Sequence, residues 1–422
     1  MVGNESFRNV WYNRNHRCTS HRGEAVKSPG SRLLAASVLG LVLAANPPAR
    51  VHADDRDHPS ASRQKAATAD ERLLSLEEWN RLDRAVDRGL SFMIRQQQSD
   101  GSFPTKADGQ PGVTSLCIMA ILARGHQPGK GPFGSRIEQA IDYVLDMQDP
   151  NVGALMADRW VGGRIQRIGD GMPRSFAGNY NHGIAGVMLG EVYGMTDAKR
   201  HERIRQAIMK ALQYTRQQQL RPKRIPEERG GWRYVHFVPE NGADLSITAW
   251  QLMFLRSARN AEFNVPKEWV AEAMEYVHQS FDAEQKGFLY ALSGSERYCS
   301  RAMVGAGIVC LSLGGEHQTE TTKMAGDWIL RCSFEQYNGS SRSEDRYHYG
   351  AFYCSQAMFQ LGGDYWSRFF PKLLRVLADA QRPDGSWALE SADDGEYGNV
   401  YTTSLAVLTL ATPYQMLPIY QR

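Results

Sequence analysis

Asp244 is the acidic residue best placed to act as a proton donor. It directly precedes a predicted apolar helix, within the stretch 241–249, Asn-Gly-Ala-Asp-Leu-Ser-Ile-Thr-Ala. A carboxylic acid protonates an apolar substrate only where burial keeps it neutral and neighbouring groups return the proton. The same position suits an N-cap, whose side-chain oxygen accepts hydrogen bonds from free amides of the first helical turn. We expect Asp244 to cap the helix, and keep proton donation as the alternative.

Paired carboxylates could instead cleave a glycosidic bond, because that reaction uses two acidic side chains about 5–9.5 Å apart. The acidic candidates are Asp170, Glu240, Asp244 and the loop 390–396 with Asp393 and Asp394. For the loop, solvation at the surface is the simpler interpretation. Because the sequence does not give the separations of these groups, glycan cleavage stays open as a further alternative.

Cys299 and His348 are the weak candidates for metal ligands, since thiolate and imidazole both bind zinc. Arg297 lies two residues before Cys299, and a cation there opposes metal binding. The sequence contains no glycine-rich phosphate loop, no His-Glu-x-x-His and no Gly-x-Ser-x-Gly motif. We therefore predict neither a metal nor another cofactor.

Aromatic side chains near the ends of apolar segments could line a cavity for an apolar ligand. The predicted cavity residues are Tyr180, His182, Trp250, Tyr349, Tyr353 and Tyr401. The segment 160–180 begins with Trp160, contains several arginines among glycines, and could cover the mouth of such a cavity or bind an anion. The alternative is that these rings only fill the core.

Repeated pairs of helices must position these groups. An amphipathic segment carrying an aromatic residue recurs near residues 90, 141, 212, 274 and 326, and a sixth copy lies near 376. A second segment, apolar almost all round, follows each copy, at 113–122, 183–189, 245–255, 303–311, 349–361 and 400–410. A helix without a polar face must be covered on every side. The pattern predicts an all-α fold, a closed α/α toroid of six helical hairpins with an inner and an outer ring of helices.

The first and last repeats share a turn of the form Gln-x3-Gly-x-aromatic. Its residues are Gln97, Gly101 and Phe103 in the first repeat and Gln381, Gly385 and Trp387 in the last. Partial forms occur at 230–232 and 287–288. We expect the glycine to allow a tight reversal, the aromatic ring to fill the gap between outer helices, and the glutamine to bond the backbone of a neighbouring helix. The apolar end of the chain, 416–420, then packs where the ring closes.

Composition excludes several classes of protein. The 422 residues are 42% hydrophobic, 23% charged and 10% aromatic, which is typical of a folded globular chain. The net charge of +3 arises from residues 1–53, so no concentrated basic surface indicates a nucleic-acid partner. Five cysteines follow residue 53, and we expect most of them to pack in the core rather than to form disulfides.

The N-terminal part predicts export. Residues 33–45 form an uncharged apolar run that is too short to span a membrane but typical of a signal peptide, and small residues follow at 51–53. We predict a signal peptide at 1–53, a flexible linker at 54–70 and the toroid domain at 71–422. The mature chain would have no transmembrane segment and would be periplasmic or extracellular.

The six hairpins and the Gln-x3-Gly-x-aromatic turn resemble the squalene cyclase and protein prenyltransferase superfamily of α/α toroids, over about residues 80 to 420. Residues 244–251 and 362–366 look like the exported "prenyltransferase and squalene oxidase repeat" proteins of planctomycete-type bacteria. Class II cyclases of this superfamily use an Asp-x-Asp-Asp-Thr-Ala motif, and of its three carboxylates only Asp244 remains here. Protein prenyltransferases carry a zinc-binding Asp where this sequence has Arg297.

The resemblance therefore implies an exported toroid that lacks the complete catalytic motifs of its relatives. We predict that it binds an apolar, isoprenoid-like ligand or a protein partner in or around its central cavity. The alternative is a divergent isoprenoid cyclase or prenyltransferase that uses Asp244, and a further alternative is a glycan-active α/α barrel.

Overall fold

The computed structural model describes residues 73–161, 164–167, 176–235, 242–332, 334–339, 345–390 and 393–421. All of them belong to one compact unit. The predicted signal peptide and linker lie outside the described residues, as do Asp170, Glu240 and the side chain of Trp160. No helix among the described residues is long and apolar enough to cross a membrane.

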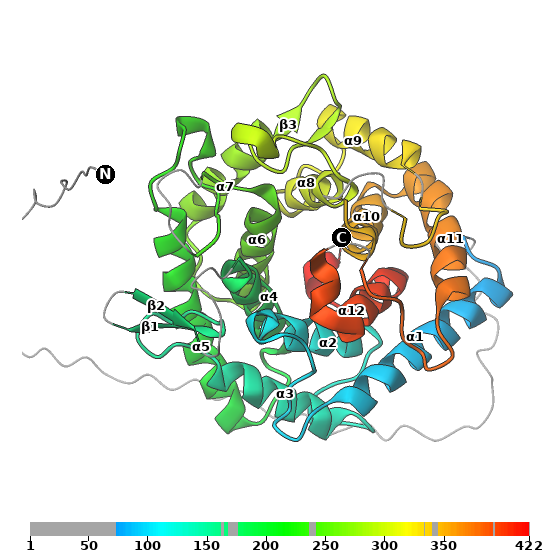
Figure 1. Cartoon of the computed structure of the whole chain (residues 1–422), viewed down its shortest axis with the longest axis horizontal. Coiled ribbons are helices and arrows are strands. Elements are labelled where there is room, and N and C mark those ends of the chain that lie inside the picture. Colours follow the sequence, from blue (N-terminus) through cyan, green and yellow to red (C-terminus); the bar gives the residue numbers. More distant parts are fainter. Residues whose placement is uncertain are drawn as a thin grey trace, which may run out of the picture. The chain divides into compact units, whose positions relative to one another are not determined.

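Six helices form a closed inner ring (Figure 1). Each packs against the next, and the last packs against the first. Their side chains are buried on almost every side, which is the burial expected for helices without a polar face. Each of the six predicted apolar segments lies within one of these helices. The inner helices are α2 (Gly112–Ala123), α4 (Gly178–Val192), α6 (Leu245–Asn260), α8 (Arg301–Leu313), α10 (Tyr347–Leu361) and α12 (Gly398–Leu410).

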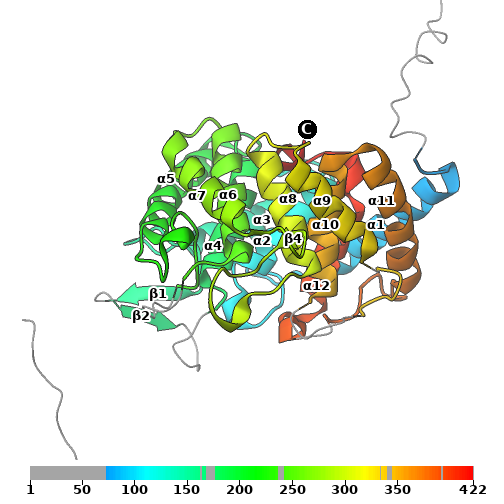
Figure 2. The ribbon, with the colours of Figure 1, turned by 90° about the horizontal axis from the view of Figure 1, so that it is seen from above.

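Six amphipathic helices surround the inner ring (Figures 1 and 2). They are α1 (Leu76–Gln96), α3 (Gly134–Asp146), α5 (Ala198–Gln219), α7 (Lys267–Gln279), α9 (Glu320–Arg331) and α11 (Gly363–Ala380). In α1 the buried residues Leu82, Val86, Leu90 and Met93 recur every three or four positions, which places them on one face. Helix α1 packs against α11 and α12, so the first and last hairpins meet. The predicted α/α toroid is confirmed.

Strands play a small part among the described residues. Strands β1 (Asp158–Val161) and β2 (Arg164–Arg167) form one antiparallel hairpin, and β3 (Phe281–Asp282) and β4 (Gly287–Phe288) form another. Each pair lies within one hairpin, in the connection from the outer to the inner helix, at α3–α4 and at α7–α8. Short 3-10 helices also occur in these connections, including η4 (Gly294–Glu296) before α8 and η5 (Asp393–Tyr397) before α12.

The glutamine of the shared turn joins neighbouring outer helices. The side-chain amide of Gln97 donates to the carbonyl of Gly101 in its own turn (3.0 Å) and to that of Arg136 on α3 (2.9 Å). Gln381 does the same with Gly385 (2.9 Å) and with Ala85 on α1 (2.8 Å). The turn of the last repeat therefore closes the ring by bonding to the first outer helix. This contact is of the same kind as the one that joins the first two repeats.

The same contact occurs at two glutamines that the sequence pattern did not single out. Gln148 donates to the carbonyls of Gly153 and of Ala207 on α5, both at 2.9 Å. Gln219 donates to the carbonyls of Gly230 (3.0 Å) and of Trp269 on α7 (2.9 Å). Because the glycine follows the glutamine by five and by eleven residues in these turns, the four-residue spacing does not detect them.

The glycine of each turn is required by its backbone. Gly101 and Gly385 have φ angles of 92° and 94°, in the left-handed region that side chains other than glycine rarely adopt. A Cβ atom at Gly101 would overlap the carbonyl oxygen of Gln139 on α3, and one at Gly385 would overlap that of Arg88 on α1. Each turn therefore lies directly against the backbone of the next outer helix.

The residue after each turn connects it to the inner ring. The backbone amides of Phe103, Trp232 and Trp387 donate to threonine hydroxyls of inner helices, at Thr114 (3.0 Å), Thr248 (3.0 Å) and Thr403 (3.2 Å). The indole of Trp387 also donates to the carbonyl of Leu377 (2.8 Å). Its side chain is fully buried. The Trp387 ring thus lies in the gap between the neighbouring outer helices α11 and α1, since a Cβ atom at Gly89 on α1 would meet it.

The C-terminal tail covers the C-terminal ends of the inner helices. It contains η6 (Thr412–Tyr414) and η7 (Pro418–Tyr420), and η7 packs against α4 and α6. Gln360 on α10 donates to the carbonyl of Tyr420 (2.8 Å), and the carboxyl of Glu191 on α4 accepts from the amide of Ile419 (3.3 Å). Residues 418–420 are packed, but against α4, α6 and α10 rather than where the first and last hairpins meet, so their expected position at the closure of the ring is wrong. Met416 and Pro418 are exposed.

The five described cysteines form no disulfide with one another. Four of them, Cys117, Cys299, Cys310 and Cys354, are buried, and Cys332 is partly buried. Burial raises the pKa of the Cys332 thiol to about 11. These residues act as core side chains, which agrees with the expected role.

We expect Gln219→Ala to lower the free energy of unfolding by about 1–3 kcal/mol, because it removes two hydrogen bonds to buried carbonyls. Gln217→Ala is the matched control, since Gln217 is exposed on the same helix. Urea denaturation of both variants measures the difference. Equal stabilities would show that the glutamine contacts do not join the outer helices.

We expect Trp387→Ala to lower the free energy of unfolding by about 3–5 kcal/mol, the cost of truncating a buried aromatic residue and leaving a cavity. Guanidinium denaturation followed by circular dichroism measures it. A loss below about 1 kcal/mol would mean that Trp387 does not fill the gap between neighbouring outer helices.

Candidate functional site

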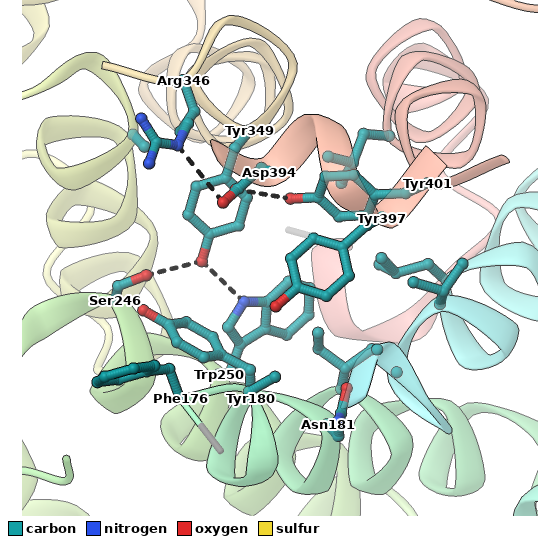
Figure 3. Close-up of a pocket in the computed structure, with 18 of the residues that line it drawn as sticks. Phe176, Tyr180, Asn181, Ser246, Trp250, Arg346, Tyr349, Asp394, Tyr397 and Tyr401 are labelled. Atoms are coloured by element: carbon teal, nitrogen blue, oxygen red, sulfur yellow. Dashed lines mark hydrogen bonds and ion pairs between the residues drawn. The ribbon is translucent and has the colours of Figure 1, made fainter. Parts of the chain in front are cut away.

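A central cavity of about 490 Å³ lies at the N-terminal ends of the inner helices. All six inner helices contribute to it, and every lining residue on them lies within the first two turns. The six helices therefore point their N-terminal ends to the same side of the ring. Figure 3 shows side chains from several of these helices converging on the cavity.

The lining residues form two layers that follow the helical repeat. Positions four apart on one helix lie one above the other. The upper layer, nearer the helix starts, contains Gly112, Tyr180, Ser246 and Tyr401, and the lower layer contains the residues four positions later, Leu116, Ile184, Trp250 and Leu405. On these four helices the upper layer is small or polar and the lower layer is apolar, so polarity changes with depth there. Near the helix starts, apolar surface also comes from Val113, Ala302 and Met303.

Buried aromatic rings close the cavity below the lower layer. Trp250 stacks in parallel on Phe352, with ring centroids 5.7 Å apart. Phe352 packs in turn against Tyr353 and against Tyr420 of the C-terminal tail. Phe352 and Tyr353 are fully buried, and neither lines the cavity. The cavity is therefore about two helical turns deep, or roughly 11 Å.

Tyr349 joins two of the inner helices across the cavity wall. Its hydroxyl accepts a hydrogen bond from the indole of Trp250 (2.9 Å) and shares another with the hydroxyl of Ser246 (2.9 Å), as Figure 3 shows. Both partners lie on α6, whereas Tyr349 lies on α10. The contacts hold the Trp250 ring at the cavity floor.

Asp394 is a carboxylate that lines the cavity. It lies in η5, before α12, and forms an ion pair with the guanidinium of Arg346 (3.4 Å). The hydroxyl of Tyr401 donates to it at 3.4 Å (Figure 3). The acidic loop 390–396, expected to be only solvated, thus places one of its carboxylates in the cavity wall.

A second charged cluster lies on the opposite part of the wall, around Arg233. This guanidinium pairs with Asp244 (3.2 Å) and with Glu296 of η4, and it lies over the ring of Tyr234, 4.5 Å from the centroid. The hydroxyls of Tyr234 and Tyr290 share a hydrogen bond of 2.5 Å. Glu296, Tyr234 and Tyr290 line the cavity.

Asp244 caps α6. One carboxyl oxygen accepts from the amide of Ile247 (2.7 Å), and the other pairs with Arg233. The side chain is fully buried and does not line the cavity. Burial raises the pKa of Asp244 to about 6, and the neighbouring guanidinium of Arg233 opposes this rise. The geometry is that of the expected N-cap, whose carboxyl oxygens are both occupied.

His182 supports a turn and does not line the cavity. Its Nδ1 accepts from the amide of Leu155 (3.1 Å), and its Nε2 bonds the hydroxyl of Thr215 (2.9 Å). Burial lowers the pKa of His182 to about 3, so the ring is neutral. His182 has the role that a threonine has in the other three turns. Its side chain accepts a hydrogen bond from the backbone amide two residues after the turn glycine. Its predicted place in the cavity wall is therefore wrong, because two residues after Tyr180 the helix faces outward.

The two weak candidates for metal ligands lie in different surroundings. Cys299 is buried before α8, where its backbone bridges to Leu289. His348 is buried in α10 and bonds the hydroxyl of Tyr337 (3.3 Å), and burial lowers its pKa to about 3. Within the described residues, no three or more His, Cys, Asp or Glu side chains gather where they could hold a metal ion.

The structure thus brings together four of the six predicted cavity residues, Tyr180, Trp250, Tyr349 and Tyr401. Tyr353 lies below the floor and His182 behind the wall. Phe176 belongs to the segment 160–180 that could cover the cavity mouth, and Asn181 follows Tyr180 at the start of the same helix. The residues that no signal in the sequence singled out are Ser246, Tyr234, Tyr290, Glu296 and Arg346; all but Ser246 lie in or next to connections.

We expect the native protein to lose roughly 1–3 kcal/mol of unfolding free energy relative to the Asp244→Asn variant as the pH rises from about 4 to 6. In this window the folded state binds a proton on Asp244 that the unfolded state releases, so stability is lost as the pH rises. Asn keeps the cap but does not titrate. Urea denaturation at several pH values measures the difference, and a flat difference would contradict the assigned pKa.

Comparisons with known proteins agree on the fold. No protein-family model and no curated protein sequence matches the chain. Among solved structures, a variant of the type II terpene cyclase MstE from Scytonema, in complex with geranylgeranyl dihydroxybenzoate, has a TM-score of 0.51 and 15% identity. It covers 82% of this chain and 100% of its own.

Glycosidases are similar to the same degree. An inactive variant of the α-1,6-mannanase GH76A of Salegentibacter sp. HEL1_6, in complex with α-1,6-mannotriose, has a TM-score of 0.54 and 10% identity, and covers 79% of this chain and 99% of its own. A glycosidase variant in complex with glucose has a TM-score of 0.53 and 15% identity, and covers 82% and 100%. The chain therefore has the α/α toroid fold found in type II terpene cyclases and in these glycosidases.

Proposed function

We propose that the central cavity binds a compact amphipathic ligand of isoprenoid type, and that the protein acts by binding rather than by catalysis. The observation that carries this proposal is the two-layered wall, polar near the mouth and apolar at the floor. The cavity volume of about 490 Å³ lies within the roughly 300–1,000 Å³ of small-molecule sites.

The apolar part of the ligand would occupy the lower layer. Leu116, Ile184, Trp250 and Leu405 offer it aliphatic and aromatic surface from four different helices. Because buried rings close the floor about two turns below the helix starts, a short isoprenoid or a single ring system fits and a long extended chain does not.

The polar end of the ligand would remain at the mouth. Tyr180 and Ser246 place hydroxyls there, and Arg346 and Asp394 offer a donor and an acceptor of opposite charge. Phe176 lies at the mouth with 56% of its surface exposed, against the edge of Tyr234. A ligand that covers Phe176 would remove this apolar surface from water.

Binding is favoured over catalysis because the acidic groups near the cavity are occupied. Asp244 caps a helix and pairs with Arg233, Glu296 pairs with the same arginine, and Asp394 pairs with Arg346. A general acid must hold a proton within reach of the substrate. A cyclase or prenyltransferase that uses Asp244 is accordingly the less supported alternative.

The shared fold with a type II terpene cyclase is the only support that the comparisons give to an isoprenoid ligand. The Scytonema enzyme holds geranylgeranyl dihydroxybenzoate, which joins an apolar isoprenoid to a polar ring. Two layers of opposite polarity would suit a smaller ligand of this kind. The predicted signal peptide adds the proposal that the protein acts in the periplasm or outside the cell.

Glycan binding or cleavage is the second candidate. Glu296 and Asp394 both line the cavity from connections that lead into α8 and α12, two helices that are not adjacent in the ring. Two carboxylates across a cavity are the arrangement that glycoside hydrolysis requires. Their pairing with arginines favours the isoprenoid proposal over this one.

Native mass spectrometry of the protein purified from its own host, before and after organic extraction, tests the proposal. We expect a stoichiometric adduct that extraction removes. Ala302→Trp should abolish it, because Ala302 lines the cavity and the larger side chain fills it. Met209→Trp is the control, since Met209 is exposed on an outer helix and its replacement should leave the adduct unchanged.

Three results would contradict the proposal. An unliganded mass for the native protein would argue against a retained ligand, and an adduct that survives in folded Ala302→Trp would lie outside the cavity. An adduct whose mass is a multiple of a hexose unit would favour the glycan candidate. Circular dichroism checks that both variants are folded.

A further inference from the structure

A second cavity, of about 280 Å³, lies at the other end of the inner helices. It is bounded by the C-terminal parts of α6 and α8, the loop after α8 and the C-terminal tail. It shares no lining residue with the central cavity, which is formed by the N-terminal ends of the same helices. The two cavities are therefore separate sites.

Two arginines dominate the charge of this second cavity. Arg256 and Arg259 lie one turn apart on α6, so they share a face of the helix. Both are exposed, and neither guanidinium group forms a hydrogen bond or ion pair with the described residues. In contrast, Arg200 and Arg216 on the neighbouring outer helix α5 are paired with carboxylates. No Asp or Glu lines the second cavity, although the carboxyl of Glu191 accepts from the amide of Ile419, one of the lining residues.

The inner part of the second cavity is apolar. Val309 and Leu313 of α8 and Ile419 of the tail line it. The tail is held in place here, since Gln360 donates to the carbonyl of Tyr420 and Glu191 accepts from the amide of Ile419. The loop side is open, because a Cβ atom on Gly315 would meet nothing within 4 Å. The site therefore combines a fixed apolar wall with an accessible cationic edge.

We propose that the second cavity binds an amphipathic anion, a carboxylate or phosphate group on a short apolar tail. The anionic group would lie between Arg256 and Arg259, because guanidinium groups bind carboxylates and phosphates through paired hydrogen bonds. The tail would pack against Val309, Leu313 and Ile419. The small volume restricts the ligand to a short chain.

Isothermal titration calorimetry of the purified protein with octyl phosphate tests this proposal. Octanol has the same tail without the charge, and inorganic phosphate has the charge without the tail. We expect saturable binding of octyl phosphate at one site, weaker binding of inorganic phosphate, and no detectable binding of octanol. Octanoate should bind as octyl phosphate does if the site accepts either anion.

The double variant Arg256→Ala/Arg259→Ala should weaken the binding of octyl phosphate by about tenfold for each arginine, the effect of losing a hydrogen bond to a charged group. Arg84→Ala/Lys199→Ala is the matched control, since it removes the same charge from exposed positions on outer helices. Thermal unfolding shows whether both proteins remain folded. If the double variant is unfolded, Arg256→Gln and Arg259→Gln are measured singly.

Equal affinities of the native protein and the double variant would overturn the proposal. So would an equal loss in the matched control, which would show an effect of net charge alone, or equally tight binding of octanol. Ala302→Trp, which fills only the central cavity, should leave the binding of octyl phosphate unchanged. Loss of binding in that variant would place the anion in the central cavity instead.

Discussion

A pair of hydrogen bonds from one glutamine amide to two backbone carbonyls is the contact on which the ring depends. It occurs after α1, α3, α5 and α11, and each time it joins the end of one outer helix to the next outer helix. On that next helix, the turn glutamine bonds one backbone carbonyl and the turn glycine packs against another. The second carbonyl belongs to the residue three positions after the first in all four turns. Four turns with different loop lengths thus use the same geometry, and the last of them closes the ring.

This contact also determines where the cavity forms. The residue after each turn is bonded to an inner helix, so outer helix, turn and inner helix are held together as one unit. In three units the acceptor is a threonine, and in the unit of α4 it is His182. Because these four units have the same orientation, their inner helices start on the same side, and the N-terminal ends of α8 and α10 line the same cavity. Two acidic residues on this side of the ring cap the starts of inner helices. Asp244 accepts a hydrogen bond from a backbone amide of α6, and Glu390 accepts from two amides of α10.

The fold could be predicted from the sequence because its signals are local and repeated. An apolar segment without a polar face indicates a helix covered on all sides, and six such segments predict the inner ring. The turn was recognised at Gln97 and Gln381, where glycine follows after four residues, but not at Gln148 and Gln219. Their loops are longer, and only the folded chain brings the glycine to the glutamine.

The site could be predicted only in part. Tyr180, Trp250, Tyr349 and Tyr401 lie near the starts of inner helices and face the cavity. His182 and Tyr353 lie close to them in sequence, but a helix turns by about 100° per residue, and depth along the helix also matters. Glu296 and Asp394 come from connections whose course is set by tertiary contacts, so no period in the sequence indicates where they lie.

Among the described residues, the C-terminal tail and the aromatic rings next to it close the central cavity at its floor. The ring encloses a passage that the lower aromatic rings and Tyr420 block, so the interior resembles a cup and not a pore. A molecule that enters such a cup must leave by the route it came, and the part that enters first leaves last. Replacement of one bound ligand by another would then depend on how fast the innermost apolar group of the bound ligand returns to water. In a pore, by contrast, the incoming ligand could enter from the opposite end and displace the bound one.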